Sequence, residues 1–97
     1  MKPDVNAILK IYLGAGPNGG YQPIGIKERF ERAFPQDHTQ MLALVRKYLE
    51  LDHQPDWSRH TLGEEQTAFA ARLAEQFPEL DSVTAHALAC RWSYNNK

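Results

Sequence analysis

Hydrophobic residues near the C-terminus recur with a helical period on two opposite sides of the chain. At about 100° per residue, segment 81–94 carries two apolar faces separated by narrow polar seams. The residues of these faces are Val83, Ala87, Cys90 and Tyr94 on one side and Ala85, Leu88, Ala89 and Trp92 on the other. A helix that is apolar nearly all round is usually buried, so the pattern predicts a buried C-terminal helix around which the others pack.

Four further segments show the periodicity of amphipathic helices. All six prolines lie between these segments, as expected because proline disrupts helix interiors. The predicted ranges are 4–13, 25–34, 37–51 and 61–77. Asp4 is a suitable N-cap for the first helix and Gly14 ends it. Residues 61–64, Thr-Leu-Gly-Glu, fit a capping box at the start of the fourth.

No segment has a convincing partner strand, so the sequence predicts a single all-α domain of four or five helices over residues 1–97. The glycine loop, residues 14–25, follows the first helix and holds five of the six glycines. Loops of this length in small domains are more often functional than short ones. Tyr21 and Ile24 lie within the loop, and they either pin it to the core or form an exposed recognition surface.

The first part of the glycine loop resembles a nucleotide-binding motif. Residues 14–19, Gly-Ala-Gly-Pro-Asn-Gly, match the pattern G-x-G-x-x-G, which binds a pyrophosphate when it joins a strand to a helix. Here the preceding segment is predicted to be helical, and residues 20–23 do not start a helix at once. The loop is therefore interpreted as a helix C-cap followed by turns, with Asn18–Gly19 as a favoured turn pair.

Composition, charge and cysteine content indicate in which compartment this protein is expected. The 97 residues include 11 basic and 12 acidic side chains, giving a net charge of −1, and 42% of the residues are hydrophobic. Cys90 is the only cysteine, which favours a reducing compartment. No apolar run approaches the roughly 20 residues of a membrane span, and no signal peptide is expected. We therefore expect a cytoplasmic protein without a membrane partner.

The basic residues do not form the stripe that nucleic-acid binding requires. They alternate with Glu28, Glu31 and Glu50, which is typical of a solvated helix face. The densest of them are Lys27, Arg29, Arg32, Arg46 and Lys47. Nucleic-acid binding through these five side chains remains the least favoured binding hypothesis.

Segment 52–60, between the third and fourth helices, gathers polar groups that can carry chemistry. His53, Asp56 and His60 are the candidates for a metal site or for a general base with its orienting acid. Their spacing matches no known metal motif, and we find no cysteine or glutamate at a supporting interval. The segment is interpreted as a polar loop with Trp57 folded back as a plug in the core. Metal or small-ligand binding here, or in the glycine loop, is the alternative.

The polar seams of the last helix hold His86 and Arg91. Each must find a partner or reach the surface if that helix is buried. Arg91 is interpreted as a structural ion pair, and binding of an anionic ligand by its guanidinium group remains open. Cys90 is expected to be inert, because we find no histidine or aspartate arranged to activate it. No enzyme activity and no cofactor are predicted.

The leading hypothesis for function is a small interaction or regulatory module. Two observations support this hypothesis. The chain has many large apolar residues, and we recognise no catalytic set of residues in it. If one apolar face of the last helix stays open, that face is expected to bind a partner protein or a second copy of the chain. Trp92 and Tyr94 are the predicted anchors on that helix, with Tyr21 and Ile24 as candidates on the glycine loop.

Overall fold

The computed structural model describes residues 4–17 and 19–96, and this part of the chain forms five α-helices and no strand. The helices are α1 (Val5–Leu13), α2 (Ile26–Ala33), α3 (His38–Leu49), α4 (Leu62–Gln76) and α5 (Ser82–Asn95). The predicted all-α class is confirmed, and each helix falls close to its predicted range. Asn18 of the predicted turn pair lies outside the described residues. None of the described helices is long and apolar enough to cross a membrane.

Local capping explains where the helices begin and end. The Asp4 carboxylate accepts a hydrogen bond from the backbone N–H of Asn6, and Gly14 ends α1 in the left-handed conformation at φ 68°. Thr61 and Glu64 form both hydrogen bonds of the predicted capping box at the start of α4. These bonds satisfy backbone groups that a helix end leaves without partners.

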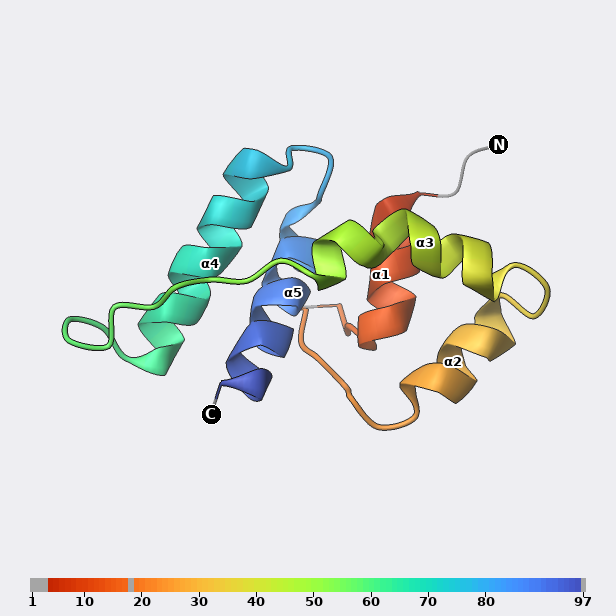
Figure 1. Ribbon diagram of the computed structural model, residues 1–97, viewed down its shortest axis with the longest axis horizontal. Coiled ribbons are helices and arrows are strands. Elements are labelled where there is room, and N and C mark those ends of the chain that lie inside the picture. The colour runs from red at the N-terminus through yellow and green to blue at the C-terminus, as the bar shows by residue number, and fades with distance from the viewer. Residues whose placement is uncertain (1–3, 18, 97) are drawn as a thin grey trace.

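The five helices form an elongated body of 46 × 27 × 23 Å. Helices α4 and α5 run side by side, and α1 lies on the other side of α5, with α2 and α3 packed around α1 (Figure 1). Helix α5 buries more positions than any other helix described. Its buried residues are Thr84, Ala85, Ala87, Leu88, Ala89, Trp92 and Ser93. The predicted burial of the last helix is therefore observed, and α1 shares the central position with it.

A buried asparagine joins the two halves of the molecule. Asn6 of α1 is 8% exposed. Its Nδ2 donates to the carbonyl oxygen of Glu79 at 2.9 Å, and its Oδ1 accepts from the N–H of Asp81 at 2.8 Å. Lys10, one turn further along α1, pairs with the Asp81 carboxylate at 2.7 Å. These bonds fix the α4–α5 turn against α1.

The glycine loop lies along one side of α5. Gly16 and Gly19 pair through two backbone hydrogen bonds of 3.0 Å, which forms a tight turn. Gly19 then passes so close to α5 that a Cβ atom there would lie 2.4 Å from the His86 ring. Tyr21 packs edge-to-face on Tyr94 with ring centroids 5.5 Å apart. The loop thus connects α1 to α2 by turns, as predicted, and α2 begins only at Ile26.

The close approach of Gly19 to α5 gives a testable prediction. Gly19→Ala should reduce the free energy of unfolding by about 2 kcal/mol or more, because the new methyl group clashes with His86 and alanine is strained at φ 88°. Gly20→Ala is the matched control: it has φ 106° but no atom within 4 Å of the new Cβ, so it isolates the backbone strain. Urea unfolding measures both. Equal losses in the two variants would contradict the packing described here.

Candidate functional site

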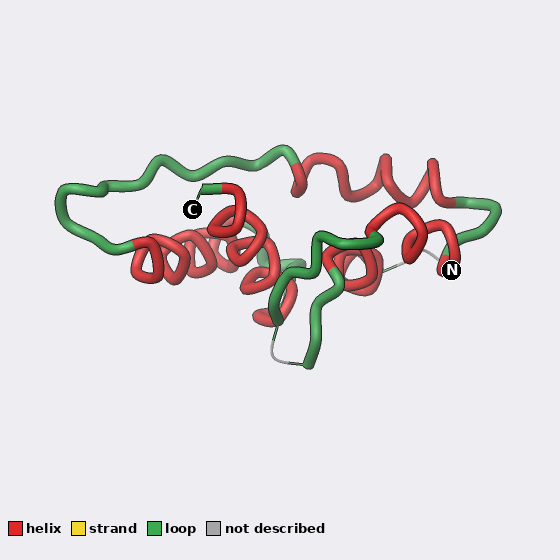
Figure 2. The backbone as a smooth tube through the Cα atoms, turned by 90° about the horizontal axis from the view of Figure 1, so that it is seen from below, coloured by secondary structure: helices red, strands yellow, loops and turns green. Residues whose placement is uncertain are grey.

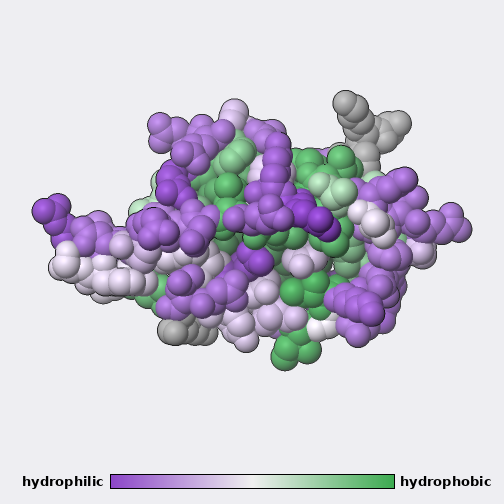
Figure 3. Space-filling model, in the orientation of Figure 1, coloured by the Kyte–Doolittle hydropathy of each residue, from purple (hydrophilic) through white to green (hydrophobic). Residues whose placement is uncertain are grey.

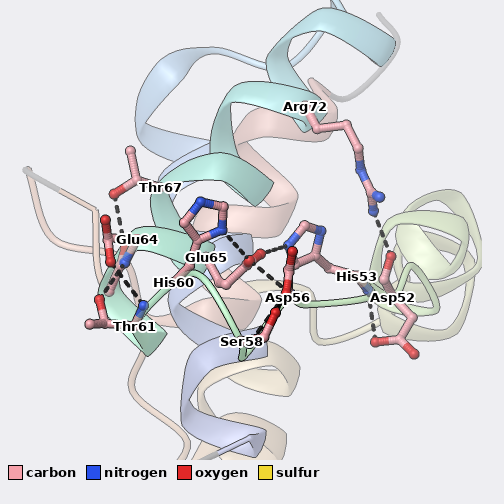
Figure 4. Close-up of polar contacts among 11 residues, drawn as sticks. Asp52, His53, Asp56, Ser58, His60, Thr61, Glu64, Glu65, Thr67 and Arg72 are labelled. Carbon is pink, nitrogen blue, oxygen red and sulfur yellow. Dashed lines mark hydrogen bonds and ion pairs between the residues drawn. The ribbon is translucent and has the colours of Figure 1, made fainter.

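The connector, residues 50–61, is an irregular segment that runs from α3 across to the start of α4 (Figures 1 and 2). It is held by Glu65, which stands in the first turn of α4 and is 3% exposed. The Glu65 carboxylate accepts from His53 Nε2 at 2.6 Å, His60 Nδ1 at 2.8 Å and the backbone N–H of Asp56 at 2.9 Å (Figure 4). One buried anion therefore binds three points of the connector.

These hydrogen bonds fix the protonation of the cluster. An ionised carboxylate only accepts hydrogen bonds, so the bonded ring nitrogens of His53 and His60 each carry the hydrogen. Three hydrogen bonds lower the pKa of Glu65 to about 2. The bond from the Asp56 N–H has the largest effect, and the bonds from His53 and His60 follow. The bond to Glu65 raises the pKa of His60. The cluster is thus anionic at its centre at neutral pH.

A histidine bonded to a carboxylate is also the arrangement of a general base, but the surroundings of His53 oppose that role. Its ring stacks on Phe69 with centroids 5.0 Å apart and meets Trp92 edge-to-face at 5.0 Å. Its second nitrogen, Nδ1, is buried and has no hydrogen-bond partner among the described residues. A substrate in solution cannot reach this nitrogen, so the pair of His53 and Glu65 holds the connector in place.

The three residues predicted as a metal or base site do not converge through their side chains. Asp56 reaches Glu65 only through its backbone, while its carboxylate accepts from the N–H and the hydroxyl of Ser58. Within residues 4–17 and 19–96, no group of three His, Cys, Asp or Glu side chains is arranged to hold a metal ion. His53 and His60 instead share one carboxylate.

Glu65 is the partner of both histidines, so the expectation that no glutamate stands at a supporting interval is wrong. The helical period of the sequence could have indicated that Glu65 is buried. Glu65 lies one turn before Phe69 and two turns before Leu73 on the buried side of α4. A glutamate on an apolar face requires polar partners, and the histidines of the preceding segment supply them.

The tryptophans also differ from the prediction. Trp92 is 5% exposed and belongs to the core, so it is not available as the expected partner-binding anchor. Trp57, predicted to plug the core, is 53% exposed and lies parallel to Trp92 at 6.2 Å. Trp92 is the bulkiest side chain of α5 and is buried in the core. Trp57 therefore lies outside the core, where its ring covers one face of the Trp92 ring.

The other predicted anchors lie on or beside the glycine loop. Tyr21 is partly buried and packs against the core, which favours the pinning alternative for this residue. Tyr94 is 48% exposed and contacts Tyr21, whereas Ile24 is 81% exposed. Of the four predicted anchors, Ile24 is therefore the most accessible to a partner.

Cys90 has two polar neighbours that differ from the inert surroundings expected from the sequence. His86 Nε2 lies 3.5 Å from the Cys90 sulfur, and Gln66 Nε2 donates to that sulfur at 3.3 Å. The spacing of four residues between His86 and Cys90 was the available signal. Burial nevertheless raises the pKa of the Cys90 thiol, which disfavours the thiolate that a nucleophile needs.

Arg29 has a structural role that its place among the basic residues did not reveal. Its guanidinium group donates to backbone oxygens at the end of α1 and in the glycine loop. These oxygens belong to Ile11 at 2.7 Å, Tyr12 at 2.8 Å, Gln22 at 2.9 Å and Ile24 at 3.3 Å. Because the N–H groups of Arg29 donate to backbone oxygens within the fold, the hypothesis that Arg29 contacts the phosphate groups of a nucleic acid is weakened.

A groove of about 350 Å³ lies between α1, α2 and α3. Its apolar lining comes from Tyr12, Ile26, Phe30 and Leu42. Lys27, Glu31 and His38 supply the polar part of its lining. The groove has the composition of an apolar binding site with a charged edge.

No family model matches this chain, and no curated protein or solved structure shows significant similarity to it. The groove and the neighbouring Ile24 together offer an exposed surface for binding.

Glu65→Gln should lower the melting temperature by roughly 10 °C, because the amide loses the charge and part of the accepting capacity that three donors share. Glu75→Gln, an exposed position on the same helix, is the control and should change it by no more than about 2 °C. Differential scanning calorimetry measures both. Equal effects of the two substitutions would show that Glu65 does not hold the connector.

The cluster also predicts how stability depends on pH. Glu65 has a folded pKa of about 2, below its ordinary value of about 4.3, so its contribution is lost as the pH falls from about 5 towards 2. The raised pKa of His60 adds stability at low pH that is lost as the pH rises through that pKa. The difference in melting temperature between wild type and Glu65→Gln should therefore be largest near pH 5 to 6. A difference that stays constant from pH 2 to 8 would contradict this assignment.

Proposed function

We propose that this protein is a protein-interaction module that binds a second copy of itself through the groove and Ile24. The observation that carries the proposal is the exposure of Ile24, at 81% the highest among the large hydrophobic side chains described. Hydrophobic surface also gathers over the middle of the face drawn in Figure 3, between hydrophilic residues on both sides. The proposed setting is the cytoplasm, where a free thiol such as that of Cys90 persists.

Ile24 is exposed on a backbone that is held in place. Arg29 binds the carbonyl oxygens of Gln22 and Ile24, and the N–H of Gln22 donates to Leu13 at 2.8 Å. Leaving an isoleucine in water instead of burying it forgoes roughly 1.5–3 kcal/mol. A fixed and exposed isoleucine therefore gains that free energy when a partner covers it, with little loss of conformational entropy on binding.

The groove offers a complementary surface close to Ile24. Ile24 precedes the groove residue Ile26 by two positions, so their Cα atoms lie within about 7 Å of each other. A projecting side chain beside an apolar groove suits a two-fold symmetric dimer, because each copy can place its Ile24 in the groove of the other. Phe30 and Leu42 would then contact the incoming isoleucine.

The charges at the groove support a second copy as the occupant. Lys27 and Glu31 are one helical turn apart on α2 and both line the groove. If α2 of each copy approaches the other in antiparallel orientation, Lys27 of each copy lies opposite Glu31 of the other. This arrangement pairs opposite charges twice and matches the charge pattern of the groove to itself.

Sedimentation velocity at protein concentrations from about 10 to 500 µM tests the proposal. Wild type should show a monomer–dimer equilibrium, and Ile24→Asp should weaken it at least about 100-fold, as removal of a central anchor does. Leu44→Asp is the control, because Leu44 is exposed on α3 but does not line the groove. A wild-type chain that stays monomeric at 500 µM, or an Ile24→Asp variant that still dimerises, would overturn the proposal.

A charge exchange tests the orientation separately. Lys27→Glu and Glu31→Lys should each weaken the dimer, since each places like charges opposite one another. The double variant should recover most of the wild-type association, because every Lys27–Glu31 pair is restored with its signs reversed. Additive weakening in the double variant would exclude the antiparallel contact of the two α2 helices.

A further inference from the structure

Trp57 is an exposed aromatic side chain that the proposed function does not use. It is 53% exposed, and its ring lies parallel to that of the buried Trp92, with 15° between the planes and centroids 6.2 Å apart. One face of the Trp57 ring is therefore turned towards Trp92, and the other is turned towards solvent. The turn that carries it, residues 56–59, lies at one end of the molecule, and α2 with the groove lies towards the other end (Figure 1).

The backbone that carries Trp57 is held in a fixed turn. The carbonyl oxygen of Asp56 accepts from the N–H of Arg59 at 3.1 Å. The Asp56 carboxylate accepts from the N–H of Ser58 at 3.2 Å, and the Asp56 N–H donates to Glu65 at 2.9 Å. A preorganised aromatic side chain loses little conformational entropy when a partner covers it. Trp57 thus has the properties of a binding anchor.

The surface around this turn is acidic. Segment 50–64 carries four carboxylates and one guanidinium group, whereas the rest of the chain carries eight acidic and ten basic side chains. All four carboxylates belong to exposed residues, which are Glu50, Asp52, Asp56 and Glu64. Asp56 directly precedes Trp57, and Glu64 directly precedes Glu65, whose carboxylate binds the Asp56 N–H. Asp56 and Glu64 therefore stand at the same end of the connector as Trp57.

Two basic side chains also belong to this surface, and neither neutralises it. His60 is bonded through Nδ1 to the buried Glu65 at 2.8 Å, so a proton that His60 gains offsets the charge of Glu65. Arg59 is 80% exposed, and its Nε lies 3.8 Å from Asp56 Oδ2, which is longer than a hydrogen bond. The half-exposed carboxylate of Asp56 therefore keeps an oxygen for a donor from outside the chain.

We propose that the turn at Trp57 docks an arginine-bearing segment of a partner protein. A guanidinium group is the cation that both stacks on an aromatic face and donates to a carboxylate. Trp57 offers the free face and Asp56 the acceptor, from which the partner's guanidinium displaces the loosely held Arg59. The other carboxylates of segment 50–64 favour the approach of a cationic segment. A single-stranded nucleic acid also stacks on tryptophan, but its phosphate groups would be repelled by these carboxylates.

Synthetic peptides test the proposal. The probe has three arginines that alternate with glycines, and the matched peptides carry lysine or glutamine instead of arginine. The arginine peptide should shift the indole N–H signal of Trp57 saturably in a ¹H–¹⁵N correlation spectrum, where loss of a signal in Trp57→Phe identifies it. By fluorescence anisotropy, the arginine peptide should bind at least about 3-fold more tightly than the lysine peptide and about 10-fold more tightly than the glutamine peptide.

Variants separate the roles of the ring and the charges. Trp57→Ala should weaken binding of the arginine peptide at least about 10-fold, as removal of an anchor does. Asp56→Asn should weaken it about 3-fold, since asparagine keeps the acceptor for Ser58 but loses the charge. Glu75→Gln, exposed near the other end of α4, is the matched control and should leave the affinity unchanged. Arg59→Gln should strengthen binding, because it removes the competing cation.

Four outcomes would overturn the proposal. The first is the lack of a saturable shift with the arginine peptide up to about 1 mM, and the second is wild-type affinity in Trp57→Ala. The third is a shift of the Trp57 signal when the protein concentration alone is raised, which would assign this surface to a second copy of the chain. The fourth is tighter binding of a single-stranded oligonucleotide than of the arginine peptide.

Discussion

Two irregular segments of this small chain must satisfy their backbone polar groups without the hydrogen bonds of helices or sheets. Each is held by charged side chains from one helix: Arg29 of α2 holds the glycine loop, and Glu65 and Arg72 of α4 hold the connector. The Arg29 guanidinium group donates to backbone oxygens at the end of α1 and in the glycine loop. The Glu65 carboxylate accepts from three N–H groups of the connector, and Arg72 donates to the carbonyl oxygen of Asp52. The position of Ile24 and the course of the connector depend on these contacts.

The surfaces proposed for binding lie where these segments meet the helices. Arg29 fixes the backbone of Ile24 beside the groove, so the most exposed hydrophobic side chain has a defined position. Glu65 fixes the His53 ring against the rings of Phe69 and Trp92. A rigid scaffold that presents loop residues is a common arrangement for binding sites. The structure thus links stability to the presentation of Ile24 beside the groove.

The helices could be predicted from the sequence because their signals are local. The predicted ranges of all five helices agree closely with the observed ones. They followed from the period of the apolar residues, from the capping box at Thr61 and from the prolines between segments. The site could be predicted only in part, since its contacts join segments distant in sequence. The histidines of the connector were recognised, but their partner Glu65 was assigned to no role. The contact of Gly19 with His86 joins positions far apart in the sequence, and no local pattern indicates it.

Amide hydrogen exchange of the native protein tests most directly whether charged side chains of α2 and α4 hold the two segments in place. The informative amides are Asp56, which donates to Glu65, and Gln22, which donates to Leu13 next to the Arg29 contacts. Gln54, for which the described structure shows no backbone hydrogen bond, is the internal reference. We predict that Asp56 and Gln22 exchange at least about 100-fold more slowly than Gln54. Exchange of all three at the rates of an unstructured chain would contradict the account.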